Sequence, residues 1–264
     1  MKIEYRWADG HYDRLPELVA DLIRQRVDVI VAAGSSAPGL AAKAATATIP
    51  IVFQTGADPV ADGLVGSMNR PGGNITGVSR MTVLLDPKRL ELLHQAVPKA
   101  SVFAILVNRD SPRANFVIEQ LQKAAQSLGL SIAIMKVGAE NELEGAFAMS
   151  VQQGANALLV SNDPVMQRWA DKIVALTIQH ALPAMFNNRM YVRAGGLMSY
   201  DSSIADSYRQ AGVYVGRILK GEKPGDLPIL EPTKFDLVLN LKTAKTLGLA
   251  IPQSMVVAAD EVIE

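Results

Sequence analysis

The sequence predicts an α/β fold with two doubly wound, parallel-sheet lobes. Short segments rich in Val, Ile and Leu alternate with amphipathic helical segments at intervals of roughly 25 residues, which is typical of parallel strands joined by right-handed crossovers. The strand segments are continuously apolar, and this indicates sheets that are covered by helices on both faces. About nine strands would make one very wide sheet without a nucleotide-binding motif, so we expect two sheets.

The expected strands are short apolar segments, followed near the end of the chain by one more strand and helix within Phe235–Leu247. They are Ile3–Trp7, Val27–Ala33, Pro50–Gln54, Ile75–Ser79, Val102–Asn108, Ser131–Val137, Ala157–Val160, Ala184–Phe186 and Gly196–Ser199. Several helix starts can also be predicted. Asp86, Ser111 and Asp163 each precede a proline, which is typical of an N-cap followed by proline at the first helical position. Ser203 and Asp206 have capping-box spacing.

Composition narrows the classes of function. The 264 residues carry 26 basic and 26 acidic side chains, so no net charge draws the chain to nucleic acid or to an anionic membrane. The sequence contains no cysteine, which excludes disulfides and thiolate metal sites. No apolar run approaches the roughly 20 residues of a membrane span, and the start of the chain has no signal-peptide pattern.

In the first lobe, polar groups are expected where strands end. The segment from Val29 to Gly39 runs from a buried strand through Ser35 and Ser36 into an alanine-rich helix. Ligands of open α/β sheets bind at such strand ends, where helix N–H groups can hold an anion. The alternative is that Ser36 only caps this helix, although capping and binding can coexist. Phe53 lies near the end of the next strand and Asp58 lies in the turn that follows it, although Phe53 suits a core and Asp58 a turn.

In the second lobe, the same position of the sheet carries amide and carboxylate side chains. Asn162 and Asp163 follow one strand, and capping alone would explain Asp163. Asn187 and Asn188 follow the next strand, and Tyr200 lies near the end of another. Each residue is weak evidence by itself, but their shared position predicts a cleft that binds a small molecule.

Signals for an enzyme are poor. His11, His94 and His180 are isolated and lack metal-ligand spacing, so we expect neither a metal nor a cofactor. The chain has no G-x-S-x-G or G-x-G-x-x-G motif, and Leu40 and Ala41 replace the residues that a P-loop needs. The sequence nominates no catalytic residue.

An ordered series of motifs resembles the solute-binding component of a family of ABC uptake transporters, whose members include receptors for tryptophan and other aromatic amino acids. The resemblance covers essentially the whole chain, and the motifs are specific for the family but not for a ligand. They are Gly34-Ser35-Ser36-Ala37-Pro38, Asp58-Pro59-Val60, Arg70-Pro71-Gly72-Gly73-Asn74, Lys88-Arg89-Leu90-Glu91-Leu92-Leu93, Gly195-Gly196-Leu197-Met198-Ser199-Tyr200 and Asn240-Leu241-Lys242-Thr243-Ala244-Lys245.

The resemblance implies a type I periplasmic-binding fold, with three crossovers and a hinge that closes on the ligand. The lobes would comprise 1–80 with 199–230 and 81–198 with 231–264. Ser35 and Ser36 would face a ligand carboxylate, and Asp58 would lie in the cleft. Asn162 and Asp163 match a pair that helps to hold the amino group, although Asp163 is shifted by one residue. Ser203 stands where some members carry Asp.

The resemblance also suggests that the pattern starts one unit late. Family members have a secretion signal, a first strand and a first helix before the segment that matches Ile3–Trp7. We therefore expect a truncated or mis-started form, or a first sheet whose gap is filled by another segment or by a partner chain.

The leading hypothesis is a non-enzymatic, periplasmic receptor. It would capture an amino acid, an aromatic compound or a related metabolite in an interlobe cleft and deliver it to the permease subunit of an ABC transporter. The alternatives are a ligand sensor for a signalling partner and, less favoured, an α/β enzyme that uses the same cleft.

Overall fold

The computed structural model describes residues 2–232 and 234–264. The chain divides into two compact units. The first unit comprises Met1–Met81 and Ser203–Lys234, and the second comprises Thr82–Ser202 and Phe235–Glu264. The chain therefore crosses between the units three times, after Met81, after Ser202 and after Lys234.

The observed boundaries differ by a few residues from the expected lobes. Strand β8 (Met198–Asp201) belongs to the sheet of the second unit, so the expected boundary at 199 would cut this strand. Residues 199–202 therefore lie with the second unit. The segment 231–234 lies with the first unit.

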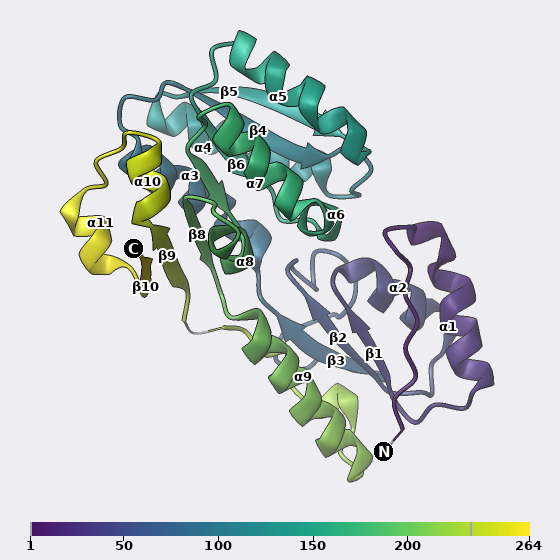
Figure 1. The fold of residues 1–264 in the computed structure, drawn as a ribbon. Coiled ribbons are helices and arrows are strands. Elements are labelled where there is room, and N and C mark those ends of the chain that lie inside the picture. Colours follow the sequence, from purple (N-terminus) through teal and green to yellow (C-terminus); the bar gives the residue numbers. More distant parts are fainter. Residues whose placement is uncertain (1, 233) are drawn as a thin grey trace. The chain divides into compact units, whose positions relative to one another are not determined.

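The first unit contains a three-stranded parallel sheet covered on both faces. Its strands are β1 (Ile30–Ala33), β2 (Ile51–Thr55) and β3 (Ile75–Ser79), paired in that order. One face packs under α1 (Leu15–Arg24) and α2 (Ser36–Ala45), and the other packs against α9 (Ile204–Leu219) (Figure 1). Successive residues of a strand pack into cores on opposite faces of the sheet, with Ile51 and Phe53 on one face and Val52 on the other.

The expectation of a strand at Ile3–Trp7 is wrong, because this segment makes no strand pairing. Residues Ile3, Tyr5 and Trp7 are 57%, 63% and 70% exposed, and the Tyr5 ring stacks on the Trp7 ring. Arg6 instead ties the segment to α1 by an ion pair of 2.6 Å with Asp21. Among the described residues, β1 pairs only with β2.

The second unit contains a seven-stranded sheet in the order β10-β9-β8-β7-β6-β4-β5. The strands not yet given are β4 (Val102–Asn108), β5 (Ser131–Val137), β6 (Ala157–Val160), β7 (Ala184–Phe186), β9 (Asp236–Asn240) and β10 (Glu261–Ile263). The helices are α3 (Asp86–Ala96), α4 (Ala114–Leu128), α5 (Leu143–Gln152), α6 (Pro164–Arg168), α7 (Ala170–Gln179), α8 (Arg189–Arg193), α10 (Leu241–Thr246) and α11 (Gln253–Ala258).

Two cores flank this sheet, as the continuously apolar strands predict. In β4, Phe103 and Ile105 join the core beneath α3 and α4, whereas Ala104 and Leu106 join the core beneath α5 and α7. All four side chains are fully buried. A strand between two helical layers must be apolar at every position, which explains why no alternation is visible in the sequence.

One strand pair departs from the predicted parallel arrangement. Strand β9 pairs antiparallel with β8, with Met198 opposite Leu239. The chain enters β9 directly after its third crossing, without a crossover helix that would return it to the starting edge of the sheet. The short strand β10 then pairs parallel to β9 and had no counterpart among the predicted strands.

The helix caps follow the predictions only in part. Asp163 accepts a hydrogen bond from the amide of Val165 at 2.8 Å, and Ser203 accepts one from Asp206 at 3.2 Å, so both are N-caps. Asp86 is instead the first residue of α3, and its carboxylate bonds Arg89. Ser111 lies before the start of α4 at Ala114.

Within the described ranges, no helix combines the length and the apolar character that a membrane crossing requires.

Candidate ligand-binding site

The second unit has a topological switch point between β4 and β6. These strands are neighbours, but the chain leaves β4 toward β5 on one side and leaves β6 toward β7 on the other. Open α/β sheets bind ligands outside the carboxyl ends of strands at such a point. Asn108 ends β4, and its Nδ2 donates to Oδ1 of Asp163 after β6 at 3.1 Å. The predicted strand ends therefore meet at this edge of the sheet.

The carboxylate of Asp163 makes its hydrogen bonds within the second unit. Its Oδ1 accepts both the Val165 amide and the Asn108 amide, and only 4% of the residue is exposed. Burial raises the pKa of Asp163, and the hydrogen bonds from Val165, Asn108 and Ser111 oppose that rise. The geometry assigns Asp163 a capping role, which was the simpler of its two sequence interpretations.

Removing the Asp163 side-chain acceptor should destabilise the protein. Asp163→Ala is expected to lower the free energy of unfolding by about 1 kcal/mol, whereas Asp163→Asn should change it by only a few tenths, because Asn caps helices as well as Asp. Urea unfolding of the two variants measures the difference. Equal losses in both would show that the negative charge, rather than the cap, matters at this position.

Asn162 and Asn187, here called the amide pair, join the ends of β6 and β7. Nδ2 of Asn187 donates to Oδ1 of Asn162 at 3.0 Å and to the carbonyl of Ser161 at 3.2 Å. Nδ2 of Asn162 donates to Oγ1 of Thr82 at 2.5 Å. Asn162 is half-buried and Asn187 is fully buried, and Oδ1 of Asn187 has no hydrogen-bond partner among the residues that the structure describes. The amide pair is therefore a pre-ordered polar group at the switch-point edge.

The remaining candidates of the second half of the sequence have local roles. Asn188 is the N-cap of α8 and accepts from the amide of Met190 at 2.9 Å. Tyr200 is half-buried and stacks on Phe235, with ring centroids 5.9 Å apart. Ser203, in the first unit, is exposed and occupied as the cap of α9.

In the first unit, Ser35 and Ser36 lie where β1 leads into α2. Ser35 is the N-cap of α2, but its side chain makes no capping bond. Ser36 is buried, and its hydroxyl donates to Asp62 at 2.5 Å and lies 3.1 Å from Oγ1 of Thr55. The side chain of Ser36 is thus engaged within the unit. The Ser35 hydroxyl and the first amides of α2 form the end of the helix that favours an anion.

Phe53 and Asp58 lie in the core and in a turn of the first unit, respectively. Phe53 is fully buried in the core of the first unit, and its ring and carbonyl lie against Gly77. Its role as a ligand platform is therefore corrected to a core role. Asp58 is half-buried, and its Oδ1 accepts from the amides of Val60 and Ala61 at 2.9 and 3.1 Å, which shapes the turn after β2.

Sequence reasoning missed several polar residues that contact the candidates, among them Asn108, Thr82 and Asp62. Asn108 was placed correctly as the last residue of a strand, so its strand-end position was an available signal. Thr82 begins a short 3-10 helix (Thr82–Leu85) and Asp62 lies in a turn, and no sequence pattern pairs them with Asn162 or Ser36.

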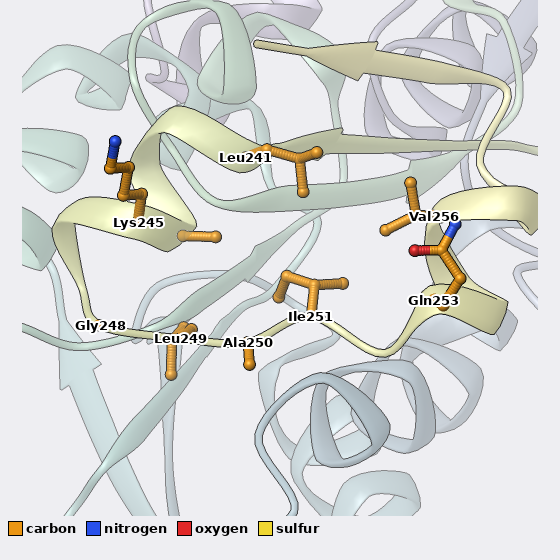
Figure 2. Close-up of a pocket in the computed structure, with 9 residues that line it drawn as sticks. Leu241, Lys245, Gly248, Leu249, Ala250, Ile251, Gln253 and Val256 are labelled. Atoms are coloured by element: carbon orange, nitrogen blue, oxygen red, sulfur yellow. The ribbon is translucent and has the colours of Figure 1, made fainter.

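A separate apolar hollow lies between α10 and α11 (Figure 2). Leu241, Ile251 and Val256 face one another across it, and Lys245 extends from its rim (Figure 2). Because β9 runs antiparallel, α10 begins beside Leu197 at the amino end of β8. The hollow is therefore at the opposite edge of the sheet from the amide pair.

No group of three or more His, Asp or Glu side chains suited to a metal ion occurs in the part of the chain that the structure describes.

Comparison with known proteins identifies the family. The family model described as ABC transporter substrate binding protein matches residues 1–263. The chain belongs to this family. A curated relative, the tyrosine-binding protein of Clostridioides difficile strain R20291, is 24% identical over 255 residues, which cover 94% of this chain and 71% of the relative.

Two solved structures show the fold of this family member. A conserved domain protein from Vibrio cholerae has a TM-score of 0.90 at 24% identity, covering 99% of this chain and 87% of its own. The ABC domain of a protein from Streptococcus pneumonia, in complex with L-Trp, has a TM-score of 0.87 at 24% identity, covering 100% and 90%. These similarities confirm the predicted type I periplasmic-binding-protein fold. The family is one of substrate-binding proteins, and the curated relative is named for the binding of tyrosine.

Proposed function

We propose that this chain is the solute-binding component of an ABC uptake transporter and that its ligand is an amino acid, an aromatic compound or a related small metabolite. Membership of the substrate-binding family over residues 1–263 is the observation that carries this proposal. The relatives named for tyrosine and in complex with L-Trp support the ligand class.

The ligand-binding groups that we propose lie at the carboxyl ends of the strands in each unit. In the first unit, the Ser35 hydroxyl and the N-terminal amides of α2 would hold a carboxylate, because the helix end is electropositive. In the second unit, the amide pair would supply hydrogen bonds to polar groups of the ligand. Asn162 is the more accessible member of the pair.

The proposed partner is the membrane permease of the transporter, and the proposed site of action is the periplasm. Members of this family work outside the cytoplasm, where they bind a small molecule for an ABC transporter. For the permease to distinguish the loaded receptor from the empty one, the two must differ in conformation. The ligand can favour one conformation only if it binds that conformation more tightly than the other.

A thermal-unfolding screen tests the proposal. The purified chain would be heated with single compounds from three sets: aromatic amino acids, aromatic acids without an amino group, and sugars. A ligand at 100 times its dissociation constant stabilises the folded state by about 2.7 kcal/mol, which gives a clear rise in Tm. Absence of any rise across all three sets would count against the proposal.

Asn162→Ala is expected to weaken binding of the compound found in that screen by roughly tenfold or more, since one or two hydrogen bonds in a desolvated site are lost. The matched control is Asn156→Ala. Asn156 precedes β6, whereas Asn162 follows it, so the two residues flank the same strand at opposite edges of the sheet. Isothermal titration calorimetry should show a weaker affinity for the ligand in Asn162→Ala and an unchanged affinity in Asn156→Ala. Equal affinities for both variants would remove Asn162 from the site.

A further inference from the structure

A fully buried ionic cluster in the second unit is not used by the candidate site. Arg89 of α3 and Asp86 one turn earlier have no exposed surface, and their ion pair measures 2.6 Å. Asp201 at the end of β8 lies 3.5 Å from the second terminal nitrogen of Arg89. Burial raises the pKa of Asp86, and the neighbouring Arg89 opposes that rise.

Arg89 also binds the backbone at two of the three chain crossings. Its Nη1 donates to the carbonyl of Thr82 at 2.9 Å, and its Nε donates to the carbonyl of Tyr200 at 2.8 Å. Thr82 is the first residue after the first crossing. The second crossing follows Ser202, and Tyr200 lies two residues before it. One side chain therefore joins the chain segments at two of the three crossings between the units.

Thr82 connects this cluster to the amide pair. Its carbonyl accepts from Arg89, and its hydroxyl oxygen accepts from Nδ2 of Asn162 at 2.5 Å. Asn162 in turn accepts from Asn187 at 3.0 Å. Thr82 is fully buried, so few alternative partners from solvent can replace these bonds. A continuous set of hydrogen bonds thus runs from the crossings to the strand ends.

We propose that Arg89 and Thr82 are positioning residues that couple the first and second chain crossings to the amide pair. This inference rests on the proposed function, in which the amide pair contacts the ligand. A change of backbone conformation at Thr82 moves the hydroxyl oxygen that accepts the hydrogen bond from Asn162. Conversely, a ligand that hydrogen-bonds to Asn162 favours one backbone conformation at the crossing. Such reciprocity is what linkage requires of two coupled sites.

The test uses substitutions that keep the packing. Thr82→Val keeps the shape of the side chain and removes the acceptor, whereas Thr82→Ser keeps the hydroxyl. With L-tryptophan and L-tyrosine as probes, Thr82→Val is expected to raise the Kd by about tenfold and Thr82→Ser by less than about twofold. In the Asn162→Ala background, Thr82→Val should add no further loss, since both changes act on one hydrogen bond. Independent, additive losses would overturn the proposal.

A second readout does not depend on any ligand. The side-chain amide resonances of Asn162 and Asn187 can be followed by NMR in the free protein. Arg89→Lys, which touches neither asparagine, should shift both resonances. Lys88→Ala is the control on the same helix, because Lys88 is exposed and pairs only with Glu91 at 2.9 Å among the bonds described.

The two readouts separate failure of the inference from failure of the proposed function. Unshifted amide resonances in a folded Arg89→Lys protein would overturn the coupling, whether or not a probe binds. Shifted resonances without binding of either probe would support the coupling and count against the proposed ligand class.

Discussion

Arg89→Met is expected to lower the free energy of unfolding by about 3–5 kcal/mol, because removing one partner leaves buried charges without compensation. Asp86 and Asp201 would lose their shared cation, and the carbonyls of Thr82 and Tyr200 would lose their donors. Methionine has a similar reach and fills the space with apolar atoms, so a cavity contributes little to this loss.

Urea unfolding followed by circular dichroism measures this effect. Lys88→Met removes a positive charge from the exposed side of the same helix, and we expect it to change stability by no more than about 0.5 kcal/mol. A loss below about 1 kcal/mol for Arg89→Met would show that the cluster contributes little beyond packing, since a buried ion pair is not stabilising by itself.

Gly77→Ala should be the second most destabilising change, and we expect overpacking to lower the free energy of unfolding by about 3 kcal/mol. A Cβ at Gly77 would lie 2.2 Å from the carbonyl oxygen of Phe53 and 2.7 Å from its ring. The carbonyl belongs to the neighbouring strand β2, in which Phe53 is the register partner of Gly77. The backbone cannot move away without breaking the sheet pairing.

Gly212→Ala is the matched control. Gly212 lies on the exposed side of α9, and a Cβ there would meet nothing within 4 Å. Alanine should therefore stabilise the helix by about 0.5–1 kcal/mol. Thermal unfolding of both variants gives the comparison, and the account of the Phe53 core would be wrong if Gly77→Ala unfolded at the wild-type temperature.

Most strands could be predicted because each is a short apolar run between polar turns. Ile75–Ser79 and Val102–Asn108 were predicted with the bounds that the structure shows. The failure at Ile3–Trp7 has a physical cause, since a strand needs a neighbour to pair with and local composition does not say whether one is present. The antiparallel β9 depends on where the chain returns from its third crossing, which no local pattern encodes.

Strand-end position could nominate candidate residues, but it could not assign a role to each of them. Strand-end position nominated Asn162 and Asn187, and the structure shows that their side chains are hydrogen-bonded to each other. It could not separate them from Phe53, because an aromatic residue at a strand end can face either a core or a ligand. The sequence placed Arg89 in a family motif but could not predict its buried contacts, because Tyr200 and Asp201 come from a distant part of the chain.

The proposed function requires that this chain bind a small organic ligand, with Asn162 of the second unit among the proposed ligand-binding groups. Isothermal titration of the purified chain with L-tryptophan, L-tyrosine and the best compound of the thermal screen tests it most directly. We predict saturable binding at one site per chain for at least one of them, and at least about tenfold weaker binding in Asn162→Ala. The absence of saturable heat for all three, or wild-type affinity in Asn162→Ala, would contradict the account.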